Sequence, residues 1–151
     1  MLLGGLTGTP VPYDRAMATL LAHITVRPGA EAEFESVARV LYERTHATEH
    51  AVRHYEYWRG AGERTYYTLL SFPDHRGFIA HQTSDHHETA SPQLGRLIES
   101  LRLEWLDPIL GASPLPPTEM QSAPADADQL TVDYTDRFAA VIADWWGTIG
   151  E

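Results

Sequence analysis

The chain has 151 residues, 43% hydrophobic and 21% charged, which suits one soluble globular domain with an appendage. A formal net charge of -10 argues against nucleic acid and anionic membranes as partners, since both attract basic surfaces. The positive side chains are all arginines and there is no cysteine, so lysine chemistry, disulfides, thiol nucleophiles and thiolate metal sites are excluded.

Residues 1–17 form an N-terminal extension without the basic start and long apolar run of a signal peptide. Met17 is an alternative natural start of the chain. No apolar stretch approaches the length that a membrane-spanning helix needs. We therefore expect a cytoplasmic protein that does not contact a membrane.

The first half of segment 18–110 changes from a strand pattern to a helix pattern. Thr19–Val26 alternates like a β-strand, and the Arg-Pro-Gly turn at 27–29 ends it. Ala30–Thr45 then has helical spacing, with an apolar stripe formed by Phe34, Val37, Ala38 and Leu41.

The second half of this segment predicts a hairpin, a helical region and a last strand. Val52–Arg59 and Thr65–Phe72 are aromatic-rich strands joined by a turn at Gly60–Glu63. The helical region consists of Asp74–Gln82 and Ser91–Leu101, with a break at Ser84–Asp85, and the last short strand is Arg102–Leu110. The resulting order β-α-β-β-α-β is that of a ferredoxin-like, split βαβ unit in the α+β class.

The chain after residue 110 has a different composition. Residues 111–128 form a linker rich in Pro, Ala and Asp, whose prolines forbid a regular helix. Residues 129–151 predict an amphipathic helix that Gly147 ends, with apolar side chains at helical spacing: Leu130, Tyr134, Phe138, Val141, Ile142 and Trp145. Because such a helix is not stable alone, it must dock on its own subunit or on a partner.

Histidine is the main source of reactive side chains. His81 and His86 flank the predicted helix break, where an imidazole with a pKa near neutrality could take a proton from a phenol or an enol. The alternative is that this pair makes surface or capping hydrogen bonds. His23 and His54 lie on predicted strands and could point into the protein, where a histidine is more often a packed core residue than a catalyst.

Two short segments carry residues that bind metals in other proteins. His46–His50 has the H-x-x-E-H pattern of inverted zinc peptidases, but a third, distant ligand is needed and the segment lies at the end of a helix. Asp85–Glu88 contains two adjacent histidines, which rarely point at one ion, so we expect a solvated polar turn there. The sequence predicts no metal site.

Aromatic side chains on the two middle strands are numerous enough to wall a flat apolar cavity, although core packing is their commoner role: Tyr55, Tyr57, Trp58, Tyr66, Tyr67 and Phe72. Arg53 and Arg59 are either surface residues or contacts for an anionic substrate. There is no glycine-rich phosphate loop, dinucleotide fingerprint or nucleophile elbow. We therefore expect no nicotinamide or flavin cofactor.

Several short motifs, in this order, resemble the antibiotic biosynthesis monooxygenase family. Arg27–Glu31 is similar to the family's Pro-Gly turn before an acidic helix start, and His54–Tyr57 to its Arg-Tyr-Glu strand. Ala80 and His81, followed by His86, are similar to its second helix, and Leu106–Pro108 loosely matches its closing strand. The resemblance covers residues 18–110.

This resemblance implies a ferredoxin-like sheet that pairs with a second copy in a dimeric α+β barrel, so we expect a homodimer. It also implies a cofactor-independent monooxygenase that oxidises a phenolic, anthrone-like or quinol small molecule with O2, without a metal. The expected catalytic residues are His81, as base or proton relay, with Tyr67 and His23. The expected substrate-binding residues are Trp58, His54, His86, Tyr57 and Arg53.

Three other functions fit the same sequence features. Relatives with this fold degrade haem, which would need an iron-binding histidine such as His81 or His86. A small-molecule isomerase or cyclase would use the same proton-transfer groups without oxygen. A non-catalytic dimeric binding module would use the acidic C-terminal helix as its contact element.

Overall fold

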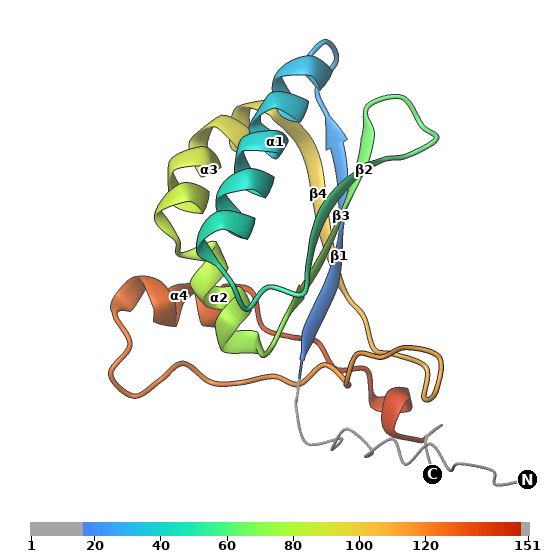
Figure 1. Cartoon of the computed structure of the whole chain (residues 1–151), viewed down its shortest axis with the longest axis vertical. Coiled ribbons are helices and arrows are strands. Elements are labelled where there is room, and N and C mark those ends of the chain that lie inside the picture. The colour runs from blue at the N-terminus through green and yellow to red at the C-terminus, as the bar shows by residue number, and fades with distance from the viewer. Residues whose placement is uncertain (1–16, 149–151) are drawn as a thin grey trace, which may run out of the picture.

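The computed structural model describes residues 17–148, so the predicted N-terminal extension, apart from Met17, lies outside the described residues. The strands form one antiparallel sheet in the order β2-β3-β1-β4 (Figure 1). The strands are β1 (Ala18–Val26), β2 (His54–Arg59), β3 (Thr65–Phe72) and β4 (Ile98–Trp105). This order, with β1 between β3 and β4, confirms the predicted ferredoxin-like α+β unit.

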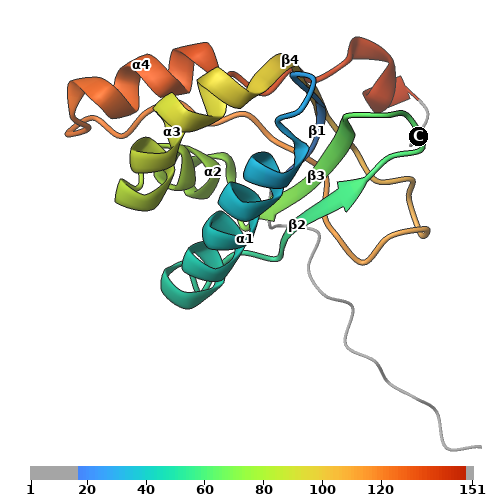
Figure 2. The same cartoon turned by 90° about the horizontal axis from the view of Figure 1, so that it is seen from above.

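The helices α1 (Glu31–Thr48), α2 (His75–Gln82) and α3 (Asp85–Leu97) cover one face of this sheet (Figures 1 and 2). Alternate residues of β1, among them Leu20, Ile24 and Val26, point to this face and are buried. They pack against the stripe of α1 that its helical spacing predicts, including Phe34 and Leu41. The hydrophobic core therefore lies between the sheet and the helices.

No helix among residues 17–148 covers the other face of the sheet, which we call the open face (Figure 1). His23 is paired with Tyr67, and Tyr67 with Trp58, so these three side chains share one face. Leu21 and Leu69 are also paired on this face. A second copy of the chain against the open face stays a prediction.

The second part of the helical region, predicted from Ser91, and the last strand begin earlier than predicted. Helix α3 starts at Asp85, directly after the break, because the Ser84 side chain caps it by accepting a hydrogen bond from the His87 N–H. Strand β4 starts at Ile98, so the prediction of a helix to Leu101 was wrong. Pairing of this segment with β1 supplies the backbone hydrogen bonds that a longer helix would have used.

The C-terminal helix is shorter than predicted. Helix α4 (Gln129–Arg137) is followed by irregular chain and a short 3-10 helix, η1 (Asp144–Thr148), so the prediction of one helix as far as Gly147 was wrong. The physical reason lies at Phe138, whose carbonyl accepts a hydrogen bond of 3.0 Å from Nε2 of His75 in α2 and is thereby taken from helical bonding. The tail thus docks on its own subunit.

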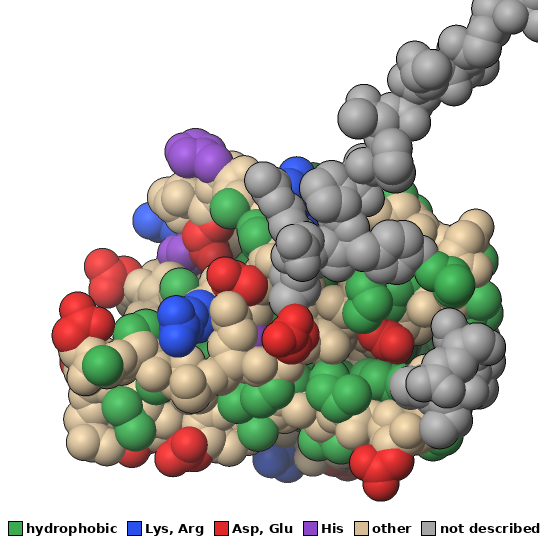
Figure 3. Space-filling view, turned by 90° about the horizontal axis from the view of Figure 1, so that it is seen from below, with side chains coloured by type: hydrophobic (Ala, Val, Ile, Leu, Met, Phe, Trp, Pro, Cys, Tyr) green, Lys and Arg blue, Asp and Glu red, His purple; other side chains and the backbone are tan. Residues whose placement is uncertain are grey.

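Residues 111–128 contain neither a helix nor a named strand, as their prolines predict. Thr118 nevertheless fixes this segment to the sheet, because its side chain accepts from the Thr19 N–H at 3.2 Å and donates to the Leu106 carbonyl at 2.6 Å. From below, acidic and hydrophobic side chains are mixed over this end of the molecule (Figure 3). No helix among the described residues has the length and apolar character to cross a membrane.

Candidate active site: an aromatic cleft backed by a buried histidine pair

A cleft of about 510 Å³ opens between α1 and the outer strands β2 and β3. Phe34 and Tyr42 line it from the helix, because they lie two turns apart on the same side of α1. The remaining lining residues are Glu35, Ala38 and Arg39 of the helix and Glu56, Tyr57, Trp58, Arg59 and Tyr66 of the strands. Aromatic side chains therefore make up half of the walls, and charged groups make up most of the rest.

Glu35 is tied to two other side chains of the cleft. Arg59 donates two hydrogen bonds of 2.7 Å to the carboxylate of Glu35, and the Tyr66 hydroxyl donates a third of 3.0 Å. Mainly because of the Arg59 hydrogen bonds, and despite its partial desolvation, the pKa of Glu35 falls to about 2. Glu35 is thus ionised near neutral pH and is a poor base.

Tyr57 lines the aromatic part of the cleft and carries a hydroxyl group. Its Oη lies 2.9 Å from Oη of Tyr55, the residue two positions earlier on the same face of β2. Burial raises the pKa of Tyr57 to about 12, so its side chain is a neutral phenol at physiological pH. It can therefore donate a hydrogen bond to a ligand.

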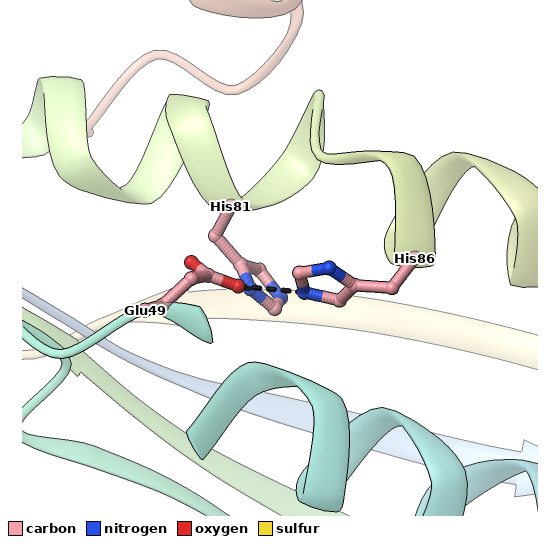
Figure 4. A group of neighbouring side chains, drawn as sticks. All are labelled: Glu49, His81 and His86. Atoms are coloured by element: carbon pink, nitrogen blue, oxygen red, sulfur yellow. Dashed lines mark hydrogen bonds and ion pairs between the residues drawn. The ribbon is translucent and has the colours of Figure 1, made fainter. Parts of the chain in front are cut away.

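Behind Tyr55 lies a buried cluster of Glu49, His81 and His86 (Figure 4). Oε2 of Glu49, the C-cap residue of α1, lies 2.9 Å from Nδ1 of His81 and 2.7 Å from Nε2 of His86. The two histidines come from the end of α2 and the start of α3, and the break at Ser84 turns these helices so that the rings converge. His81 is completely buried, and its ring centroid is 4.7 Å from that of Tyr55.

Burial alone would raise the pKa of Glu49, but the hydrogen bonds and charges of His81 and His86 outweigh it and lower this pKa. Glu49 is therefore a carboxylate that accepts from both rings. Burial, reinforced by repulsion from the same two histidines, lowers the pKa of the neighbouring His87 to about 4. His87 is accordingly neutral at physiological pH.

The cluster offers three ligand atoms within 4.8 Å of one another, which raises the question of a metal ion. In a tetrahedral zinc site with bonds of about 2.0–2.1 Å, ligand atoms lie about 3.3 Å apart. The distances of 2.7 and 2.9 Å to Glu49 are instead those of charge-assisted hydrogen bonds. Hydrogen bonding alone accounts for the arrangement, so we assign no metal role to it.

In the fold, the residues within each of the two metal-like motifs contact different partners. His46 contacts the Tyr55 carbonyl at 3.1 Å, whereas Glu49 of the same motif turns to His81 and His86, which does not fit an inverted zinc peptidase. The prediction of a solvated turn at Asp85–Glu88 was wrong. This segment is the first turn of α3, and its two histidines face the interior because the helix packs against α1.

The sheet separates the residues predicted to form the site. His81 and His86 lie together on the helix side, and Tyr57 lines the cleft there, whereas Trp58 borders the cleft from the open face of β2. His23 and Tyr67 lie on the open face, with ring centroids 5.5 Å apart.

The predicted strand histidines and Arg53 also lie away from the core. His23 contacts Glu104 at 2.8 Å and His54 contacts Glu56 at 3.3 Å, so neither is the packed core residue considered from the sequence. Arg53 is exposed just before β2. The three predicted catalytic residues therefore do not share one site within the chain.

Sequence reasoning missed Glu35 and Glu49 as site residues. Glu49 lies 32 and 37 positions before His81 and His86 in the sequence, so no local sequence pattern could predict their contact. Tyr55 and Tyr57 were only part of a larger aromatic set, but their spacing of two on a strand could have indicated a shared face.

The sequence model of the antibiotic biosynthesis monooxygenase family matches residues 17–93. A Caulobacter crescentus structure provisionally named as a member of that family is 25% identical, with a TM-score of 0.59, over 63% of this chain and 92% of that one. A Pseudomonas aeruginosa structure is 21% identical, with a TM-score of 0.58, over 62% and 95% of the two chains. A Mycobacterium tuberculosis structure is 19% identical, with a TM-score of 0.59, over 65% and 100%.

No curated protein matches the chain. The family match nevertheless spans more than half of it and includes α1, the hairpin of β2 and β3, and both histidines of the buried cluster. The solved structures share the same sheet-and-helix arrangement. The chain therefore belongs to the antibiotic biosynthesis monooxygenase family.

Proposed function

We propose that the protein is a cofactor-independent monooxygenase that oxidises a phenolic, anthrone-like or quinol small molecule with O2 in the cleft beside α1. The observation that carries this proposal is a neutral tyrosine hydroxyl, that of Tyr57, among aromatic walls in a cleft of about 510 Å³. This volume is in the range of small-molecule sites. Family membership supports the same reaction class.

The chemistry needs no electron carrier beyond the substrate. The substrate gives its acidic proton to water in the open cleft, and the resulting electron-rich anion passes one electron to O2. The two radicals then combine into a peroxide anion. This anion takes up a proton and loses water, so that a CH2 group and O2 become a carbonyl group and water. The cleft supplies a hydrogen-bond donor for the anion, Tyr57, and aromatic walls against which a flat ring can pack.

His81 does not reach the substrate in this proposal. Its side chain is completely buried and is absent from the residues that line the cleft, so it acts through other groups. Among the described residues that line the cleft there is no histidine to bind iron, so this cleft gives the haem alternative no support. The binding-module alternative has less support, since α4, part of its expected contact element, packs on α2 of its own chain.

The first test is oxygen uptake by chelator-treated protein, without added cofactor, over a panel of anthrones, naphthols and hydroquinones. We expect uptake above the uncatalysed rate, with one oxygen atom from labelled O2 in the product by mass spectrometry. A second chelator treatment should leave the rate unchanged. Conversion of a compound at the same rate without oxygen would instead favour the isomerase or cyclase alternative.

Two matched tyrosine variants locate the reaction. Tyr57→Phe removes the donor from the cleft, and we expect kcat to fall about 10²-fold with KM changed much less, as for other oxyanion donors. Tyr67→Phe makes the same chemical change on the open face, where we expect little effect. A loss of activity confined to Tyr67→Phe would place the reaction on the open face and reject the cleft.

A further inference from the structure

We propose that His46 is the base of the oxidation, and that its Nδ1 takes the substrate's proton through one water molecule of the cleft and later returns it to the peroxide anion. The inference rests on the proposed function, because it assigns a residue to the first proton transfer of that reaction. It concerns a histidine that lies one helical turn beyond the residues that line the cleft.

Two side-chain bridges join α1 to β2, one near each end of the helix. In the first turns of α1, Glu35 accepts two hydrogen bonds from Arg59 at the end of β2. In the last turn of α1, Nε2 of His46 lies 3.1 Å from the carbonyl oxygen of Tyr55, near the start of β2. The first bridge lines the cleft, and the second joins the same two elements further along it.

His46 adjoins the wall of the cleft that α1 forms. Ala38, Tyr42 and His46 follow one another at intervals of four residues, so they lie along the same side of the helix. The first two line the cleft. The ring of His46 packs against that of Tyr42, with the ring centroids 4.3 Å apart, and the residue is exposed. A water molecule beside Tyr42 can therefore connect the cleft with this imidazole.

The bridge to Tyr55 determines which nitrogen of His46 is basic. A carbonyl oxygen only accepts hydrogen bonds, so Nε2 of His46 carries the hydrogen in this contact. In the neutral ring the free lone pair is then on Nδ1. Among the described residues, no hydrogen bond or ion pair joins Nδ1 to another group. The bridge thus holds the ring while it leaves Nδ1 available as an acceptor.

The ionisable side chains that line the cleft are less suited to take a proton. Glu35 already accepts three hydrogen bonds, and its pKa of about 2 makes it a poor base. Glu56 is paired with Leu69, so its side chain lies on the open face, where it contacts His54. Arginine cations and neutral tyrosines are much weaker bases than an imidazole.

The titratable groups near His46 come from α1, from the residues directly after it and from β2: Tyr42, Glu43, Glu49, His50 and Tyr55. Oε2 of Glu49 accepts from two other histidines, His81 and His86. No carboxylate among the described residues forms an ion pair with His46. The charge of an imidazolium at this position is therefore left for the substrate anion to stabilise.

The proton that the substrate loses is the one that the peroxide anion later needs. Water passes the acidic proton of the substrate to Nδ1 of His46, which leaves a substrate anion and an imidazolium. After the anion and O2 have combined, the imidazolium returns this proton through water to the peroxide anion. The resulting hydroperoxide loses water and becomes the carbonyl product. His46 ends neutral, so the reaction consumes no co-reactant besides O2.

The first test measures proton transfer from a bound phenol rather than oxygen uptake. The probe is 4-nitrophenol, whose phenolate is coloured, so absorbance against pH gives the acid dissociation constant of the bound probe. Nitrogen NMR of isotope-labelled histidine shows which ring nitrogen of His46 carries a hydrogen. We expect this hydrogen on Nε2 in the free protein, and a second one on Nδ1 when the probe binds as phenolate. The wild-type protein should raise the acid dissociation constant of the probe about tenfold over that in water.

His46→Gln keeps an N–H donor for the Tyr55 carbonyl but has no basic nitrogen, so it separates the base from the bridge. We expect this variant to lose at least about threefold of the tenfold effect on the probe. The matched control is His50→Gln, an exposed histidine four positions later, which should retain the whole effect. His46→Ala replaces His46→Gln if circular dichroism shows that the latter does not fold.

In the oxygen assay, His46→Gln should lower kcat about 10²-fold, the usual contribution of a general base, with KM changed much less. Added imidazole should restore about tenfold of the activity that His46→Ala loses. A merely structural role of His46 in the bridge would give no such rescue.

A hydrogen on Nδ1 instead of Nε2 in the free protein would overturn the inference, as would equal ionisation of the probe in His46→Gln and the wild type. Failure of the wild-type cleft to bind 4-nitrophenol would overturn it too. The oxygen assay fails independently. A protein that ionises the probe through His46 but consumes no O2 would keep His46 as a base of the cleft and lose the monooxygenase proposal.

Discussion

Single residues set the charge of the cleft. Glu35 and Arg59 face each other across its mouth, one on α1 and the other at the end of β2, and their two parallel hydrogen bonds hold the carboxylate ionised. A compound that enters therefore meets the neutralised pair of Glu35 and Arg59 beside the neutral phenol of Tyr57. This favours flat, uncharged aromatic compounds that become anions only after they are bound.

Arg59→Ala should raise the pKa of Glu35 from about 2 by on the order of one unit, because it removes the largest cause of the lowered value. Side-chain carboxyl NMR over a pH series measures this directly. The matched control is Arg39→Ala, whose guanidinium lies 4.0 Å from Glu35 and should have a smaller effect.

The same pair makes stability depend on pH. The pKa of Glu35 is lower in the folded chain than the ordinary value of 4.5, so its contribution is present above pH 4.5 and is lost as the pH falls toward about 2. We expect the free energy of unfolding to fall less between pH 4.5 and about 2 in Arg59→Ala than in the wild type, as measured by urea unfolding. Equal acid profiles for the variant and the wild type would contradict the assigned cause.

Among the elements, α2 carries His81 but is only eight residues long and depends on its neighbours. It begins with a cap, in which Asp74 accepts from the Gly77 N–H at 2.7 Å. From the other side the tail holds it, since His75 bonds to the Phe138 carbonyl and the ring of Phe78 meets that of Phe138 edge-on. The tail therefore supports the helix that places one histidine of the cluster.

Phe138→Ala should lower the free energy of unfolding by about 2 kcal/mol, because it removes a half-buried ring from this contact. Val141→Ala, at an exposed position three residues later, is the matched control and should change it by less than about 0.5 kcal/mol. Urea denaturation distinguishes the two. If the variants were equally stable, the tail would not support α2.

Much of the architecture is predictable from the sequence, because its elements follow local periods. The alternation in β1 and the stripe on α1 each repeat over several turns or pairs, and the observed strand and helix agree with them closely. The end of α3 and the start of β4 were misplaced because Ile98–Leu101 is decided by pairing with β1, which is distant in sequence. The cluster around Glu49 and the division of His23 and Tyr67 from His81 depend likewise on tertiary contacts.

For the whole molecule, the open face is the main surface without a partner in the described chain. Leu21 and Leu69 lie half-buried beside each other on it, together with the rings of Tyr67 and Trp58. A sheet that packs helices on one face and carries such side chains on the other needs a second cover. A homodimer formed through this face, as the sequence resemblance implies, stays our proposal.

Leu69→Arg should convert a dimer of twice the chain mass into a monomer in light scattering, because it places a charge in the centre of the proposed interface. Val40→Arg, on the exposed side of α1, is the matched control and should remain dimeric. A wild-type protein that is monomeric at high concentration would reject this interface.

The central place of β1 also has a consequence for the order in which the chain is made. This strand leaves the ribosome first, yet its partners are β3 and then β4, which ends only at Trp105. Until β4 has been synthesised, one edge of β1 has no partner strand, and the contact between α2 and Phe138 forms later still. Although N-terminal parts of proteins generally fold first, here the domain is completed only when its tail has been synthesised.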